Sequence, residues 1–178
     1  MSTIRNEQME RTFYHYQLLK RVRLAKPFII AFSTLAALCI AVALYQHSLL
    51  GIGYVAASCV LIAWLHYVIG RSIFIVDRYT YKGRWAWRWR MPWIGYLPLP
   101  QQFISLRYLT KIMLHTTSIT FLVILILCPW LPLELTLLNV FWHLWLLSPR
   151  WYCLLTMRTV DSSGLVKVNE MDICLYKA

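Results

Sequence analysis

Residues 27–46 form a run of 20 residues without a charged side chain, and no other feature constrains the fold of this chain as strongly. A helix of that length is about 30 Å long, which matches the hydrocarbon core of a bilayer. Three further apolar runs follow, over residues 49–70, 112–131 and 133–148. The four runs predict four membrane-spanning helices.

The composition and the spacing of these runs predict two tight helical hairpins. Hydrophobic residues make up 60% of the 178 residues and charged residues 14%, whereas soluble domains are about 25% charged. Two residues separate the first two runs, so we expect antiparallel helical hairpins over residues 27–70 and 112–149. Gly51 and Gly53 are small enough to let the first two helices approach closely.

The segment 71–111 separates the two hairpins and is strongly basic. It holds eight Lys and Arg residues and one acidic residue, Asp77, in a chain whose formal net charge is +11. The short turn inside each hairpin contains no Lys or Arg. Because basic loops stay in the cytoplasm, we expect residues 1–26, 71–111 and 150–178 to be cytoplasmic, in a protein of the inner membrane.

The segments outside the spans carry weaker structural signals. Residues 1–26 have near-helical spacing, which indicates either a helix lying on the membrane surface or a charged tail. Aromatic and β-branched runs around Lys82-Gly83 predict a β-hairpin in which Asp77 faces Arg88 and Arg78 faces Trp87.

The tail alternates apolar and polar residues around residues 161–164 and predicts a second β-hairpin. The expected fold class is therefore an all-α integral membrane protein. Its four transmembrane helices form two antiparallel hairpins. Small cytoplasmic β-hairpins follow the second and fourth spans.

The basic loop is also rich in tryptophan, which predicts a contact surface. Such a surface adheres to anionic lipid headgroups, docks a membrane or cytoplasmic protein, or stacks on nucleic acid bases. Nucleic acid is the least favoured partner, because tryptophan side chains beside a membrane are drawn to the lipid interface. The candidate contact residues are Arg78, Arg84, Trp85, Trp87, Arg88, Trp89 and Arg90.

Three polar residues inside the spans are candidates for chemistry: His66, Asn139 and His143. Asn139 and His143 share one helix face because they are four residues apart. The two histidines are expected at similar depth, where they would hydrogen-bond between helices, ligate a haem as an axial pair, or serve a lipid-modifying enzyme. Asn139 and His143 would alternatively line the path of a small channel or transporter subunit.

Catalytic motifs are absent from the sequence, and no two acidic residues are paired within a span. The five cysteines form no metal-ligating pair, and we expect them to be reduced. The sequence therefore favours a non-catalytic accessory or scaffold subunit of a membrane assembly, without a metal, that contacts anionic lipid and a protein partner. Homo-oligomerisation is left open.

Overall fold

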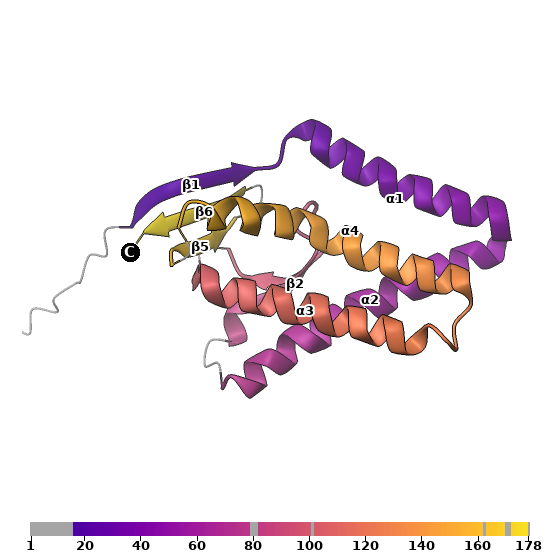
Figure 1. Cartoon of the computed structure of the whole chain (residues 1–178). Helices are drawn as coiled ribbons and strands as arrows, with labels where there is room; N and C mark the ends of the chain where they lie inside the picture. The colour runs from indigo at the N-terminus through magenta and orange to yellow at the C-terminus, as the bar shows by residue number, and fades with distance from the viewer. Residues whose placement is uncertain (1–15, 79–81, 101, 162, 170–171, 178) are drawn as a thin grey trace, which may run out of the picture.

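Four long helices dominate the computed structural model, which describes residues 16–78, 82–100, 102–161, 163–169 and 172–177 (Figure 1). The helices are α1 (Lys26–His47), α2 (Leu49–Val76), α3 (Leu106–Leu127) and α4 (Leu133–Arg158). Of these, α1, α2 and α3 are long and apolar enough to cross a membrane. The prediction of a mostly helical chain with four helices is confirmed.

The turn between α1 and α2 is as tight as the sequence predicts. Ser48 has a φ of 53°, and its amide donates a hydrogen bond to the Leu44 carbonyl at 2.9 Å. Gly51 then lies directly against the backbone of Ala43, where a Cβ atom would overlap the carbonyl group. The two helix backbones therefore approach to a distance that only glycine permits at this position.

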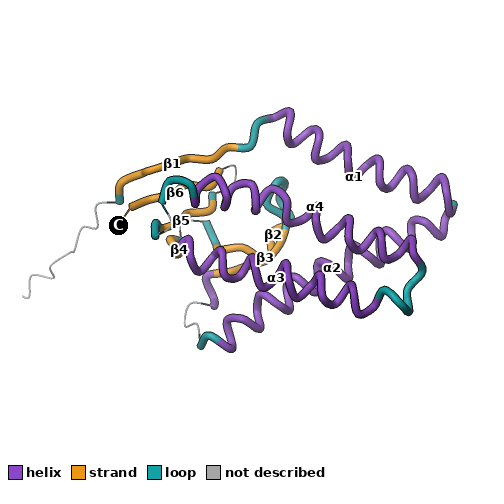
Figure 2. Tube along the Cα trace, in the orientation of Figure 1, coloured by secondary structure: helices purple, strands orange, loops and turns teal. Residues whose placement is uncertain are grey.

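The core of the bundle is formed by α2, α3 and α4, which pack along one another, while α1 lies at the side (Figure 2). Helix α1 packs on α2 within the hairpin and contacts α4 through Phe32, whose ring stacks on Trp145 with centroids 4.0 Å apart. The Trp145 indole N–H also donates to the Phe32 carbonyl at 2.9 Å. Much of the rest of α1 is exposed apolar surface.

Helix α4 continues through Pro149 to Arg158, ten residues beyond the predicted end of the fourth apolar run at Ser148. Proline lacks the N–H that would bond the carbonyl of Trp145, four residues earlier. The Ser148 hydroxyl donates to that carbonyl at 3.0 Å instead. The replacement donor lets the helix pass the proline.

Of two small antiparallel sheets, the larger lies at the end of the bundle where α4 finishes and α3 begins (Figure 1), and the smaller lies beside the helices, where it meets Gly70 of α2 and Arg150 of α4. The larger sheet has the strand order β1-β6-β5-β4, and the smaller one pairs β2 with β3. The larger sheet thus joins the N-terminal segment, the central loop and the C-terminal tail in one structure. Its strands are β1 (Gln17–Arg23), β4 (Phe103–Ser105), β5 (Leu165–Val168) and β6 (Asp172–Lys177), and the smaller sheet has β2 (Trp85–Arg88) and β3 (Gly95–Pro98).

The helix predicted within residues 1–26 is wrong for Gln17–Arg23, which forms β1 and pairs with β6; residues 1–15 lie outside the described part of the chain. The strand predicted over residues 151–160 is also wrong, because α4 extends through it to Arg158. The predicted turn at residues 161–164 instead links α4 to β5. Asp161 accepts hydrogen bonds there from the amide and hydroxyl of Ser163 at 2.8 and 2.7 Å.

A hairpin does follow α2, but the predicted pairing is wrong. Residues 73–76 continue α2 because Ile73 and Phe74 are buried in the core. Strand β2 pairs with β3, so that Arg88 lies opposite Gly95. Asp77 consequently meets Lys111, with Nζ–Oδ distances of 2.7 and 2.9 Å, and the predicted partner Arg88 lies elsewhere.

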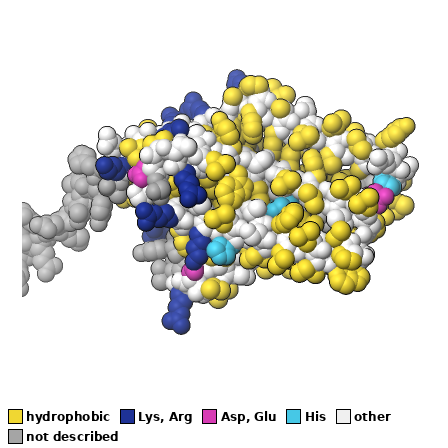
Figure 3. Space-filling view, viewed as in Figure 1, with side chains coloured by type: hydrophobic (Ala, Val, Ile, Leu, Met, Phe, Trp, Pro, Cys, Tyr) yellow, Lys and Arg dark blue, Asp and Glu magenta, His cyan; other side chains and the backbone are white. Residues whose placement is uncertain are grey.

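Basic side chains gather at the sheet end of the molecule, whereas the face over the helices is largely hydrophobic (Figure 3). The sequence accounts for this separation, since residues 27–70 and 112–149 contain no Lys or Arg. Exposed apolar side chains continue along all four helices, among them Leu38, Trp64, Leu122 and Leu144. A solvent-facing surface of this kind is unusual for a soluble monomer.

Candidate functional site

His66 of α2 and His143 of α4 meet in the centre of the bundle. Their Nε2 and Nδ1 atoms are 2.9 Å apart, and the rings lie edge to face with centroids separated by 5.2 Å. His66 is 2% exposed and His143 is 0% exposed. One of the two facing nitrogens must be protonated and donate the hydrogen bond, and the other must be unprotonated and accept it.

Further buried polar side chains lie on the same three helices. Asn139 is one helical turn before His143 on the buried face of α4, as its spacing predicts, and is 1% exposed. The buried polar residues that the sequence analysis did not name as candidates are Ser58 on α2, Thr116 and Thr120 on α3, and Thr136 and Arg150 on α4. The sequence does contain a signal for these residues. Their spacing places them on the same helix face as the buried apolar residues of their own helices.

Several of these side chains have polar atoms without a hydrogen-bond partner within the protein. They are Ser58 Oγ, His66 Nδ1, Thr120 Oγ1, Asn139 Oδ1, His143 Nε2 and the Nε and Nη2 atoms of Arg150. Each buried polar atom left in this state costs about 1–3 kcal/mol. Polar groups kept at that cost inside an apolar bundle are typical of functional positions.

Arg150 is 4% exposed, although the sequence analysis places it in the expected cytoplasmic segment 150–178. Its guanidinium group lies against the backbone of Gly95 at the start of β3, where a Cβ atom would be 2.7 Å from Cζ. Gly95 also has a φ of 129°, a conformation that other residues rarely adopt. The arginine side chain therefore lies between the helix bundle and the smaller sheet. Its positive charge is close enough to His66 to interact with it electrostatically.

The geometry of the histidine pair does not fit the haem alternative. Two axial nitrogens on one iron lie about 4 Å apart, because each metal–nitrogen bond is about 2 Å long. His66 Nε2 and His143 Nδ1 are already in direct contact at 2.9 Å. In the described part of the chain, no three His, Cys, Asp or Glu side chains come together as a metal site.

The predicted basic and aromatic surface divides into buried and exposed members. Trp85 is 5% exposed and packs on Phe74 at a ring distance of 5.0 Å, so it supports the loop from inside. Trp87 is half-buried and touches the exposed Trp89 edge to face at 5.4 Å. The arginines are more accessible: Arg88 is half-buried, and Arg78, Arg84 and Arg90 are exposed.

A second basic surface, which the sequence reading did not single out, lies between the start of α3 and the end of α4. It is a pocket of about 410 Å³ lined by Leu106, Arg107, Thr110, Lys111, Leu114, His115 and Arg158. Lys111 is held by Asp77, whereas Arg107 and Arg158 form no ion pair with another described residue. His115 Nδ1 donates to the Lys111 carbonyl at 2.8 Å, which leaves its Nε2 free to accept.

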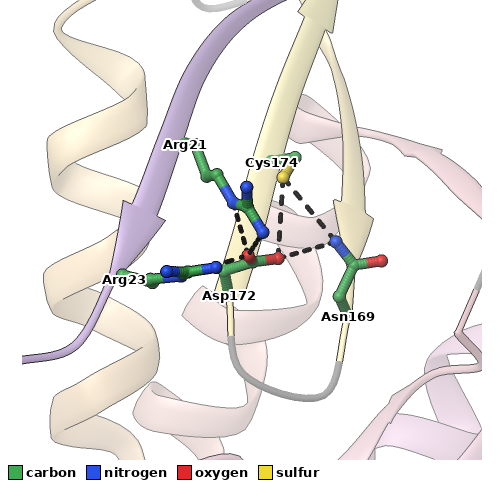
Figure 4. Close-up of polar contacts among 5 residues, drawn as sticks. All are labelled: Arg21, Arg23, Asn169, Asp172 and Cys174. Carbon is green, nitrogen blue, oxygen red and sulfur yellow. Dashed lines mark hydrogen bonds and ion pairs between the residues drawn. The ribbon is translucent and has the colours of Figure 1, made fainter.

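A third polar cluster ties β1 to the C-terminal hairpin (Figure 4). The Asp172 side chain is 3% exposed and forms ion pairs with Arg21 and Arg23 of β1. The arginines contact Oδ2 of the carboxylate. Asn169 Nδ2 donates to Oδ1 at 2.7 Å, and the Cys174 thiol lies 3.7 Å from the same Oδ1 atom. This cluster explains why β1 folds as a strand: its arginines neutralise an otherwise buried acid.

We expect the Asp172 cluster to make the larger sheet sensitive to acid. Burial raises the pKa of Asp172, but hydrogen bonds from Asn169 and Arg21 outweigh it, so the pKa lies below the ordinary value of about 3.9. The charged carboxylate stabilises the folded protein at pH values above its ordinary pKa. This stabilisation is lost as the pH falls through the lower pKa of the folded state. Unfolding of the wild type and Asp172→Asn between pH 6 and pH 2 checks this.

The wild type should be the more stable protein at pH 6, and the difference should shrink towards pH 2. Asparagine retains the size of the side chain and hydrogen-bonds without titrating, so the variant isolates the charge. Parallel stability curves for the two proteins over the whole pH range would contradict the assignment.

Comparison with protein-family models, with curated proteins and with solved structures found no match.

Proposed function

We propose that the protein is a multi-pass protein of the inner membrane that acts as an accessory or scaffold subunit of a membrane assembly, with both termini in the cytoplasm. The observation that supports this most strongly is the concentration of basic side chains at the sheet end of an otherwise apolar bundle (Figure 3). The positive end of such a bundle stays on the cytoplasmic side of the membrane.

Helix α4 is proposed as the fourth span, although its composition is less apolar than that of the other three helices. Three of the polar residues that lower its hydropathy, Asn139, His143 and Arg150, face the interior of the protein and are at most 4% exposed. The lipid-facing side of α4 would carry apolar residues such as Leu137, Leu144 and Leu155, which are exposed. Buried polar groups facing the interior of the bundle are the usual arrangement within membranes.

The cytoplasmic part would contact anionic lipid and a protein partner. The pocket between α3 and α4 combines Arg107 and Arg158, which form no ion pair within the described part of the chain, with the apolar side chain of Leu114, and this suits a phospholipid headgroup and the start of its acyl chain. Trp89 and Arg90 project from the smaller sheet and are exposed, as a docking surface requires. The larger sheet, which joins three separate segments of the chain, would support the pocket, because β4 leads directly into α3.

We expect the variant carrying Arg107→Gln and Arg158→Gln to lose most of its bound anionic lipid. The reason is electrostatic: a basic residue near an anionic membrane surface contributes about 1 kcal/mol, so losing two lowers lipid retention by roughly 30-fold. Native mass spectrometry of the detergent-purified protein with added phosphatidylglycerol or phosphatidylcholine measures the retention directly.

Lys177→Gln is the matched control, since it removes an exposed charge from β6. It should retain phosphatidylglycerol as the wild type does. Equal retention of phosphatidylglycerol and phosphatidylcholine by the wild type would contradict the proposed lipid contact.

One of the alternative functions gains support from the geometry and one loses it. A haem-based redox enzyme would require His66 and His143 to separate from their present contact. A channel or transporter subunit is favoured by the number of polar side chains buried on α2, α3 and α4. The sequence analysis proposed only Asn139 and His143 as residues lining such a path. Such a role is compatible with membership of a larger assembly.

A further inference from the structure

We propose that the contact between His66 and His143 is a proton-transfer site, and that the buried polar face of α4 lines the route by which protons reach it. This rests on the membrane insertion proposed above, and it names the proton as the species that the buried side chains handle. Neither the scaffold role nor the lipid contacts require two histidines in the centre of the bundle.

Each histidine has one ring nitrogen in the contact and one outside it. The inner nitrogens, His66 Nε2 and His143 Nδ1, are at hydrogen-bonding distance. The outer nitrogens, His66 Nδ1 and His143 Nε2, are buried and form no hydrogen bond of ordinary geometry within the protein, and the backbone of Thr117 on α3 faces His143. The pair therefore has a continuous proton path through two rings, with one free end on α2 and the other on α4.

The transfer balances without any other reactant. A proton arrives at Nδ1 of neutral His66, and the resulting imidazolium passes its Nε2 proton to Nδ1 of neutral His143. His143 then releases the proton on its Nε2, and both rings are neutral again in the opposite tautomer. Return of both rings to the starting tautomers, by rotation or by exchange of protons, completes the cycle. One proton enters and one leaves, and no electron is exchanged.

The short distance between the two histidines makes the contact selective for protons over metal ions. A proton can cross a hydrogen bond between two nitrogens 2.9 Å apart. A Na⁺ or K⁺ ion cannot lie between the same atoms, because it would need its own coordination distance to each of them. The proposal therefore predicts proton movement without accompanying metal-ion movement through the pair.

Flanking polar groups extend the route along α4. Asn139, His143 and Arg150 lie on the same buried face at intervals of four and seven residues, so they cover about 16 Å along the helix axis. Asn139 offers an unpartnered carbonyl oxygen beyond the pair, and Arg150 offers unpartnered N–H donors towards the sheet end. Thr120 of α3 and Ser58 of α2 add buried hydroxyl groups.

The test is proton flux into liposomes of phosphatidylethanolamine and phosphatidylglycerol that contain the purified protein. A potassium diffusion potential drives the flux, and a trapped pH-sensitive dye reports it. Wild-type liposomes should acidify faster than protein-free liposomes, and both His66→Gln and His143→Gln should reduce the protein-dependent rate at least tenfold. Glutamine can hydrogen-bond across the contact but cannot carry the proton.

His47→Gln is the matched control, because His47 is the last residue of α1 and lies away from the pair. It should leave the rate unchanged. Wild-type flux equal to that of protein-free liposomes would overturn the proposal, and so would a correctly inserted His143→Gln protein with wild-type flux.

A spectroscopic readout covers the case in which a variant fails to fold. In ¹⁵N-histidine-labelled wild-type protein, nuclear magnetic resonance should show a scalar coupling across the His66–His143 hydrogen bond, with one protonated and one unprotonated inner nitrogen. Absence of any coupled pair would overturn the proposal. If the protein inserts with its basic end in the cytoplasm but neither readout is positive, the scaffold proposal survives and the proton route does not.

Discussion

Replacing Gly51 with alanine is expected to destabilise the α1–α2 hairpin by about 3 kcal/mol, the upper end of the range for overpacking a tight contact. The added Cβ would lie 2.7 Å from the carbonyl carbon of Ala43 and would overlap its oxygen. Both are backbone atoms of α1, so the contact is relieved only if the helices separate. For a chain of this size, the loss corresponds to a decrease in Tm of roughly 6–12 °C.

Gly53→Ala is the matched control for this prediction. Gly53 is two residues further along the same helix, and a Cβ there would meet no atom within 4 Å. Alanine is the better helix former by about 1 kcal/mol, so this variant should be as stable as the wild type or more so. Thermal unfolding in detergent measures both, and a Gly51→Ala protein at least as stable as Gly53→Ala would contradict the close approach of the helices.

Gly95→Ala is expected to have an effect of similar size for a different reason. The new Cβ would overlap the Arg150 guanidinium, and the residue would keep a φ of 129° that costs roughly 1–2 kcal/mol for a residue with a Cβ. Arg150 is buried and cannot move away without disturbing the core. We expect a total loss of about 3 kcal/mol in the free energy of unfolding.

A double-mutant cycle separates the two contributions. In the background of Arg150→Met, the overlap is smaller and only the backbone strain should remain, so Gly95→Ala should cost less than it does in the wild type. Gly83→Ala is the control, because a Cβ at Gly83 would meet no atom within 4 Å. Equal costs of Gly95→Ala in both backgrounds would show that Arg150 does not lie on Gly95.

The helices were predictable from the sequence because a long uncharged run leaves few alternatives. The start of α1 and the short turn that follows it were found within a residue or two. The strands were harder, because each pairs with a distant segment: β1 folds as a strand through β6, which supplies Asp172 as the partner of its arginines. A local pattern of residues does not contain that information.

The candidate site was predictable in part. Asn139 and His143 follow from their positions inside an apolar run, and the structure brings His66 to His143. Arg150 was assigned to the cytoplasmic segment 150–178, because it is the first basic residue after the fourth apolar run. The Ser148 hydroxyl that compensates for the proline after it keeps α4 intact, and so Arg150 turns inwards. This is a tertiary effect that spacing alone does not reveal.

The orientation of the chain in the membrane is the most direct test of this account, since the lipid contacts and the proton route both depend on it. Single cysteines introduced as Gly83→Cys and Trp130→Cys, each in a background without the five native cysteines, report the two ends of the bundle. An impermeant thiol reagent applied to intact cells should label the cysteine at position 130 and should reach the one at position 83 only after lysis. Labelling of position 83 from outside intact cells would contradict the account.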